Sequence, residues 1–189
     1  NGRRNIIRKN VPVDSIRLSD PFVLADEKTK TYYMTGTGGM MWDSKDLKHW
    51  NGPYKVTETD PNSWMGPNPM IWAAVSDKPN GPYRPMQDET YLPDSIPTLD
   101  GTFWVDTDGK PYMIFCYEWL QNNDGTMEMI HLKDDLSGSL PYANSTEKSG
   151  GKLMFRASDS PWSKERNDKG EEVANKVTDG PYLFRTGTG

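Results

Sequence analysis

Three aspartates recur at nearly equal spacing, and each stands where a short apolar run begins. Asp20, Asp100 and Asp179 are separated by 80 and 79 residues. Carboxylates in such recurring positions can serve as a general base that activates water and as a general acid that protonates a leaving oxygen. The alternative is structural, because an Asp that opens a strand often accepts hydrogen bonds from its own backbone.

Aromatic side chains are frequent in this chain: 7 Trp, 9 Tyr and 5 Phe make up 11% of it. Flat rings with Asp and Asn between them are typical of sugar-binding clefts. A β-rich core explains the same composition, because aromatic residues favour strands and dominate burial. Composition alone favours the core.

Charge and composition exclude several classes of protein. The 189 residues carry 22 basic and 27 acidic side chains, a net charge of −5 without a Lys/Arg stripe, which argues against a nucleic-acid partner. No apolar run approaches the roughly 18 residues of a membrane span. A single Cys116 excludes an intrachain disulfide, and with only His49 and His131 beside it an all-protein zinc site is not expected.

The chain is predicted to be all-β. Short runs rich in Tyr, Phe, Val, Ile and Thr alternate with polar turn clusters, and long helical periodicity is absent. Asp108-Gly109 and Asp124-Gly125 are predicted hairpin turns, because tight turns need residues that tolerate positive φ. The expected strands are Pro21–Ala25, Thr31–Thr35, Thr102–Val105, Pro111–Tyr117, Thr126–Leu132 and Pro181–Arg185.

The equal spacing of the three Asp-led segments predicts a repeated architecture. Hairpins that recur at a fixed period indicate radial repetition, as in a β-propeller, rather than a single sandwich. Chance recurrence of Asp-Gly and Gly-Pro turns is the alternative.

Four segments in order resemble glycoside hydrolase family 43. They are Arg17–Val23, Trp64–Ala73, Leu99–Lys110 and Val177–Leu183. The resemblance implies a five-bladed β-propeller, of which only about three blades are represented here. It also implies an activity on arabinose- or xylose-containing plant polysaccharides, of the α-L-arabinofuranosidase, β-xylosidase or arabinanase type. It is strongest to secreted or periplasmic members from gut Bacteroidetes, so we expect a periplasmic or extracellular protein, although the chain shows no signal peptide.

The family pattern also implies that the chain is partial. We expect a lead-in segment at residues 1–13 and a partial propeller domain at residues 14–189. A stretch is expected to be missing after Ala74, where the family pattern would continue into a further hairpin, and the C-terminal blades are expected to be missing as well.

The resemblance assigns roles to the three aspartates. It implies that Asp20 is the general base, that Asp100 orients the acid and keeps it protonated, and that Asp179 stands at the general-acid position. Family members usually carry Glu there, one methylene longer. A displacement of about 1 Å can lower the rate on the order of a hundredfold. Therefore either the backbone compensates, another carboxyl serves, or the protein is a weak or inactive member.

Glu118 is the best alternative acid. If the turn between Asp106 and Lys110 pairs Val105 with Pro111, then Asp100 lies opposite Cys116 and diagonal to Glu118 on one sheet face. A one-residue slip would send Glu118 to the other face. Trp119 and Trp72 are candidate sugar-stacking planes; a core Trp beside a solvent-facing Glu is the alternative.

The expected function is therefore that of an inverting glycosidase that acts on an oligo- or polysaccharide substrate. The alternative is a carbohydrate-binding propeller that has lost efficient catalysis, and the unusual Asp179 supports it. The expected reaction requires no cofactor. Family members often hold calcium near a His, but the sequence does not identify a ligand set for such a structural ion.

Overall fold

The computed structural model describes residues 6–57, 71, 73–86, 92, 96–118, 121–161, 169–171 and 176–187. Its contacts divide the chain into two units, the first formed by Asn1–Trp64 with Ala74–Pro85 and the second by Met65–Ala73 with Met86–Gly189. Among the described residues, no helix is long and apolar enough to cross a membrane. The prediction of an all-β chain is confirmed, since the regular structure of the described residues is β-strand with the 3₁₀ turns η1 (Val13–Ser15) and η3 (Ala157–Asp159).

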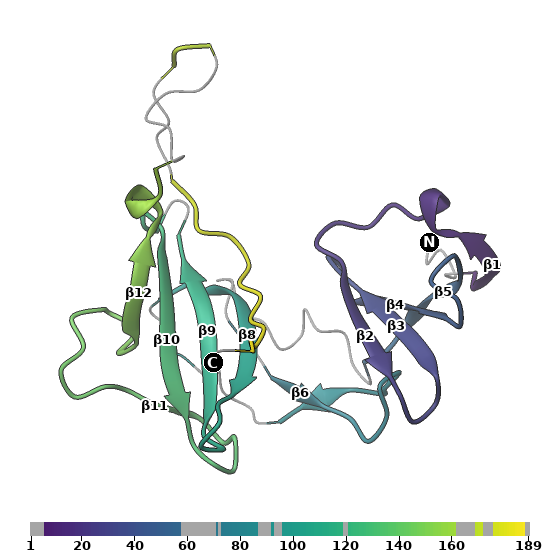
Figure 1. Cartoon of the computed structure of the whole chain (residues 1–189), viewed down its shortest axis with the longest axis horizontal. Helices are drawn as coiled ribbons and strands as arrows, with labels where there is room; N and C mark the ends of the chain where they lie inside the picture. Colours follow the sequence, from purple (N-terminus) through teal and green to yellow (C-terminus); the bar gives the residue numbers. More distant parts are fainter. Residues whose placement is uncertain are drawn as a thin grey trace, which may run out of the picture. The chain divides into compact units, whose positions relative to one another are not determined.

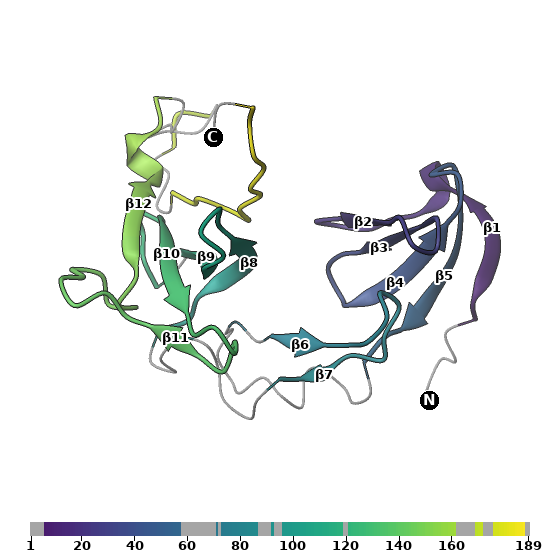
Figure 2. The same ribbon diagram turned by 60° about the horizontal axis from the view of Figure 1, so that its bottom comes forward.

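The first unit is built on an antiparallel sheet in the order β1-β5-β4-β3-β2 (Figures 1 and 2). Four of its strands are consecutive hairpins, and β1, which falls in the expected lead-in segment, adds at the β5 edge. A short ribbon of β6 and β7 belongs to the same unit. The bounds are β1 (Arg8–Pro12), β2 (Phe22–Asp26), β3 (Thr31–Thr35), β4 (Met40–Ser44), β5 (His49–Lys55), β6 (Ala74–Val75) and β7 (Arg84–Pro85).

The second unit is built on the antiparallel order β11-β10-β9-β8, in which β12 also pairs with β10. The expected strands are found here with the predicted bounds for β9 and β10, and β8 begins earlier than predicted. Consecutive hairpins in both sheets are the arrangement of propeller blades. The bounds are β8 (Leu99–Val105), β9 (Pro111–Tyr117), β10 (Thr126–Leu132), β11 (Ser139–Leu140) and β12 (Lys152–Arg156).

Both predicted hairpins form, β8–β9 and β9–β10, but only the first Asp-Gly pair makes a tight turn. Gly109, at φ 79°, turns β8 into β9, and its N–H donates to the carbonyl of Asp106. The Asp124-Gly125 pair forms no tight turn. Instead, the side chain of Asp124 accepts hydrogen bonds from Ser158, and the N–H of Gly125 donates to the carbonyl of Lys176, because residues 176–187 pass beside this end of β10.

The predicted strand Pro181–Arg185 does not pair as a strand among the described residues. Pro181 has no N–H to give to a ladder. Its carbonyl accepts the hydroxyl of Thr102 at 2.6 Å, and Leu183 packs on the β8–β9 side of the sheet. The segment therefore lies along β8 and β9 (Figure 1) and is held through side chains.

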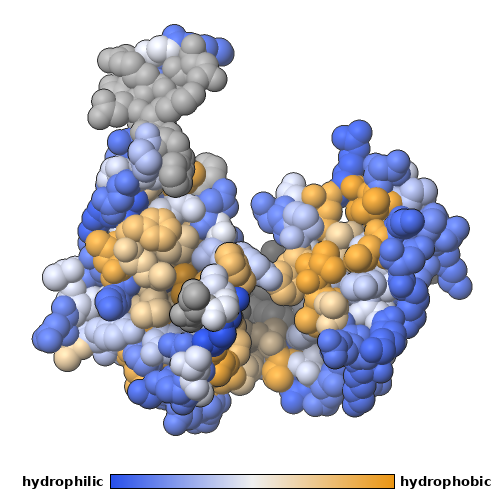
Figure 3. All heavy atoms as spheres, viewed as in Figure 1, coloured by the Kyte–Doolittle hydropathy of each residue, from blue (hydrophilic) through white to orange (hydrophobic). Residues whose placement is uncertain are grey.

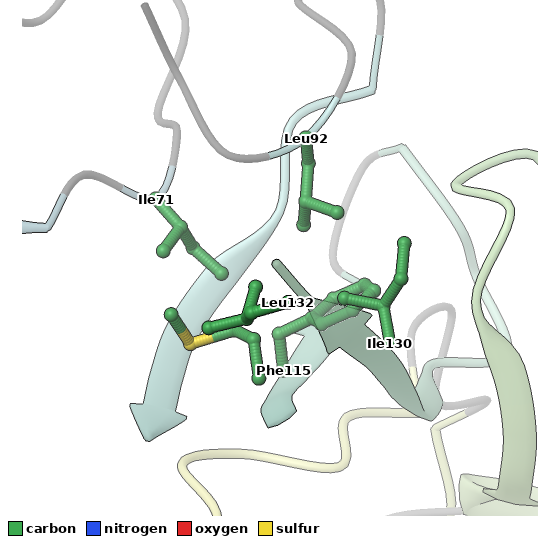
Figure 4. Close-up of a cluster of buried hydrophobic side chains, with 6 residues drawn as sticks. Ile71, Leu92, Phe115, Ile130 and Leu132 are labelled. Carbon is green, nitrogen blue, oxygen red and sulfur yellow. The ribbon is translucent and has the colours of Figure 1, made fainter. Parts of the chain in front are cut away.

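Each unit has its own apolar core. In the second unit, alternate residues of β9 and β10 face one cluster, which Ile71 and Leu92 complete (Figure 4). The other residues of the cluster are Met113, Phe115, Ile130 and Leu132. In the first unit, Trp42 and Trp50 pack with Val11 and Met34. The abundant aromatic residues therefore serve the core in part, as composition favoured.

Apolar side chains also remain on the surface of both units (Figure 3). Phe22 of β2 is 52% exposed and Phe103 of β8 is 49% exposed. Each lies shortly after one of the recurring aspartates, Phe22 after Asp20 and Phe103 after Asp100, on a strand at the edge of its sheet. Apolar patches of this kind are typical of surfaces that contact other structure.

Candidate active site

The three recurring aspartates share an unusual backbone conformation. Asp20, Asp100 and Asp179 have φ of 51°, 54° and 59°, in the left-handed region. Among non-glycine residues this region is uncommon, and Asp and Asn enter it most easily because their short polar side chains bond locally. Residues held there cluster at functional sites. The repeat seen in the sequence is therefore also a repeat of backbone geometry, and all three carboxylates are exposed.

The left-handed turn at Asp100 forms a β-bulge. Leu99 pairs with Cys116 and Thr102 pairs with Ile114. An interval of three residues on β8 is therefore paired with an interval of two residues on β9. A bulge of this kind bends the strand and redirects a side chain, and bulges are common beside active sites. The predicted register holds at Val105 and Pro111 but is shifted by one residue at Asp100, which consequently does not pair with Cys116.

The same offset occurs at Asp20. Phe22 pairs with Thr35, whereas the N–H of Thr37 donates to the carbonyl of Ser19, so again three steps match two. Thr37 thus takes the register position in the first unit that Cys116 takes in the second. Its hydroxyl donates to Oδ2 of Asp20 at 2.7 Å. The two aspartates are therefore presented by equivalent bulges.

In the second unit the structure brings Asp100 and Glu118 together with the backbone of Thr178–Gly180, which is called the Asp179 corner below. Side-chain oxygen and sulfur atoms of Asp100, Cys116 and Glu118 lie within 4.8 Å of one another. A side chain added at Gly180 would meet Asp100 Cγ and Oδ2 at 3.8 Å, so the chain immediately after Asp179 lies against the Asp100 carboxylate. Asp20 belongs to the first unit, and its surroundings are described above within that unit.

Glu118 is buried, in contrast to the three aspartates. Only 2% of it is exposed, although it lies at the end of β9. Its Oε2 atom accepts hydrogen bonds from the Thr178 N–H at 2.5 Å, the Thr178 hydroxyl at 3.0 Å and the Asp179 N–H at 3.0 Å. Glu118 is therefore neither on the opposite sheet face nor facing solvent. The sequence placed it near Asp100 but gave no sign of its bonds to residues 60 positions away.

Cys116 lies beneath the same corner and is fully buried. Its thiol donates to the carbonyl of Asp179. The pKa of this thiol is raised to about 12, chiefly by burial; a hydrogen bond with Thr178 acts in the opposite direction, and the nearby carboxylates of Glu118, Asp100 and Asp179 add to the rise. The thiol is consequently protonated at neutral pH and acts as a hydrogen-bond donor.

Glycines allow the close approach of these segments. A Cβ at Gly101 would lie 2.8 Å from Ile71 Cγ2 and 2.9 Å from Met113 Sδ, and a Cβ at Gly125 would lie 2.9 Å from both Glu118 Cβ and the Lys176 carbonyl. Side chains at these two positions would push the core away from the Asp100 bulge or push β10 away from Glu118.

The acidic group does not fit a structural calcium ion. Ca²⁺ takes six to eight oxygen ligands, whereas this group offers two carboxylates and a protonated thiol. The two histidines lie elsewhere: His49 pairs with Asp46, and His131 packs between the rings of Tyr112 and Tyr142. We therefore assign no catalytic role to a metal at this group. The remaining candidates, Trp72 and Trp119, lie outside the described residues.

No protein-family model and no curated protein matches the chain. Among solved structures, an endo-arabinase from Bacteroides thetaiotaomicron is 28% identical, with a TM-score of 0.78 over 96% of this chain and 70% of that one. A thermostable family-43 glycoside hydrolase is 17% identical, with a TM-score of 0.58 over 80% of this chain and 54% of that one.

An endo-1,4-β-xylanase from Bacteroides thetaiotaomicron is 18% identical, with a TM-score of 0.50 over 71% of this chain and 52% of that one. The two less similar structures bear on the fold alone, and the chain spans about half of their length. The family resemblance of the sequence and the likeness of the fold agree. The resemblance to glycoside hydrolase family 43 is thus confirmed, and the chain has the β-propeller fold of that family.

Proposed function

We propose that this protein hydrolyses O-glycosidic bonds of arabinose- or xylose-containing polysaccharides with inversion at the anomeric carbon. The observation that carries the proposal is the shared left-handed geometry of Asp20, Asp100 and Asp179. Three carboxylates that share this backbone geometry at nearly equal spacing are hard to explain as separate turn-forming residues. The endo-arabinase, 28% identical over most of this chain, supports arabinan as the first substrate class to test.

The proposed roles follow the family pattern. Asp20 accepts a proton from water as the water oxygen attacks the anomeric carbon, and Asp179 gives its proton to the leaving glycosidic oxygen. Asp100, beside the Asp179 corner, orients the acid and disfavours a second negative charge close by. The hydrogen bond from Thr37 holds the Asp20 carboxylate in one orientation. Protons exchanged with solvent then restore both groups.

Asp179 is proposed as the working acid although it is shorter than the usual Glu. The corner that carries it is fixed from two sides, because Glu118 accepts from its N–H and Cys116 donates to its carbonyl. A rigid corner can compensate for a shorter side chain by holding the backbone in one place. This is the compensation that the sequence left as one of three alternatives.

Turnover by the full-length protein tests the proposal. Aryl α-L-arabinofuranoside, aryl β-D-xyloside, arabinan oligomers and xylan oligomers are supplied, and the first-formed anomer is read by proton NMR. We expect release of sugar with inverted configuration, and a loss of about a hundredfold or more in Asp20→Asn and Asp179→Asn. Asp135→Asn is the matched control, since that exposed carboxylate interacts with Ser137 and Lys133 in a turn away from the three aspartates. Binding of these oligomers without turnover would contradict the proposal, as would a retained configuration.

A further inference from the structure

Glu118 reaches across the fold to the backbone of the proposed acid. Two successive N–H groups, those of Thr178 and Asp179, and the Thr178 hydroxyl all point at its Oε2 atom. We propose that Glu118 is a positioning residue, which fixes the Asp179 corner so that a short acid can reach the glycosidic oxygen. The inference rests on the proposed function for the reaction it serves, but the contact that it describes can be measured without turnover.

The three donors indicate what Glu118 does. Successive backbone N–H groups that converge on one oxygen form a concavity that suits a carboxylate oxygen. Because Glu118 is 2% exposed, these bonds form away from competing water. A buried carboxylate whose Oε2 atom accepts three hydrogen bonds is suited to hold a backbone rather than to give a proton to substrate.

The corner needs such an anchor because of its conformation. Asp179 has φ 59°, in the left-handed region that few non-glycine residues adopt. Among the described residues, Pro181–Arg185 pairs with no strand, and the Pro181 carbonyl accepts the Thr102 hydroxyl. The bonds to Glu118 include one that acts on the Asp179 backbone amide itself. Without them the corner would lose its fixed position against Asp100.

Kinetics of two substitutions separates positioning from acid catalysis. In the full-length protein, Glu118→Ala removes the acceptor, whereas Glu118→Gln keeps an oxygen that can accept the same N–H groups. With a substrate whose leaving group needs protonation, we expect kcat to fall about a hundredfold in Glu118→Ala with little change in KM. Glu118→Gln should stay within about tenfold of the parent, with the pH profile unchanged. In an Asp179→Asn background, Glu118→Ala should lower kcat little further, because it acts through Asp179.

Hydrogen exchange reads the contact itself and does not depend on activity. We expect the amides of Thr178 and Asp179 to exchange much faster in Glu118→Ala and to stay protected in Glu118→Gln. Glu128→Gln is the matched control: this glutamate on β10 is 1% exposed and accepts hydroxyls of Thr126 and Ser149, so its loss affects stability without freeing the Asp179 amide.

Two results would overturn the proposal. If Glu118→Gln were as impaired as Glu118→Ala with a poor leaving group, yet both cleaved an activated dinitrophenyl glycoside normally, Glu118 would be the acid itself. If Glu118→Ala kept both full amide protection and full turnover, Glu118 would not fix the position of the Asp179 corner. A parent protein without turnover would instead contradict the proposed function, and the exchange experiment would still decide whether Glu118 fixes the corner.

Discussion

The hydroxyl of Thr37 donates a hydrogen bond to Oδ2 of Asp20 at 2.7 Å. Thr37 follows β3 and occupies the register position there that Cys116 occupies on β9 beside the other bulged aspartate, Asp100. The two residues differ in what they do there. Thr37 bonds the aspartate side chain directly, whereas Cys116 bonds the backbone of Asp179.

Removing this hydroxyl should impair catalysis more than folding. We expect Thr37→Val to lower kcat about tenfold, because an exposed carboxylate that loses its orienting partner samples other rotamers. The loss is measured by initial rates on the best aryl glycoside. Thr35→Val at the end of β3 is the control, since the Thr35 hydroxyl donates to the Met40 carbonyl and not to Asp20. Equal loss of activity in both variants would argue that Thr37 serves the sheet and not Asp20.

The aspartates whose backbone lies in the left-handed region should tolerate substitution by Asn better than substitution by Ala. Asp→Asn keeps a side chain that suits this backbone region, whereas Ala does not. We therefore expect Asp100→Ala to be less stable than Asp100→Asn by about 1 kcal/mol in urea unfolding, with both inactive. The same order should hold at Asp179. Equal stability of the Asn and Ala variants would show that the left-handed backbone conformation costs Ala no more free energy than it costs Asn.

Two glycines near the site should respond in opposite ways. Gly125→Ala brings a Cβ to within 2.9 Å of Glu118 Cβ and of the Lys176 carbonyl, so we expect a clear loss of thermal stability, about 1–3 kcal/mol. Gly180→Ala meets its nearest atom, Asp100 Cβ, at 3.6 Å, which is ordinary contact. This variant should fold as well as the parent protein, and because its methyl group abuts the Asp100 carboxylate, its turnover should fall. Melting curves of the two variants, followed by rates, test the contrast.

Cys116 should make stability depend on alkaline pH. Burial raises the pKa of its thiol from 9.0 to about 12, so the folded state favours the protonated form. The stabilising effect is complete below pH 9, where the unfolded thiol is also protonated, and it is lost as the pH rises from there to about 12. Urea unfolding across this window should show a decline that Cys116→Ser largely abolishes, since Ser keeps a donor for the Asp179 carbonyl. If the free energy of unfolding fell as steeply with pH in Cys116→Ser as in the parent protein, ionisation of tyrosines or lysines would be the cause of the decline.

The sequence by itself determined the all-β class, the strands β3, β9 and β10, the Asp106–Lys110 hairpin and the resemblance to glycoside hydrolase family 43. These depend on local propensity, turn chemistry and a repeat that is visible along the chain. It also singled out the three aspartates.

The tertiary structure alone decided how those aspartates are presented. The bulge at Asp100 shifts the register by one residue, and pairing rules that count residues from a turn cannot detect an inserted one. Glu118 could be placed near Asp100 by register, but its bonds to Thr178 and Asp179 join parts of the chain about 60 residues apart. Such bonds depend on where residues 176–187 pass the sheet, and that path is set by packing over the whole unit rather than by any local pattern.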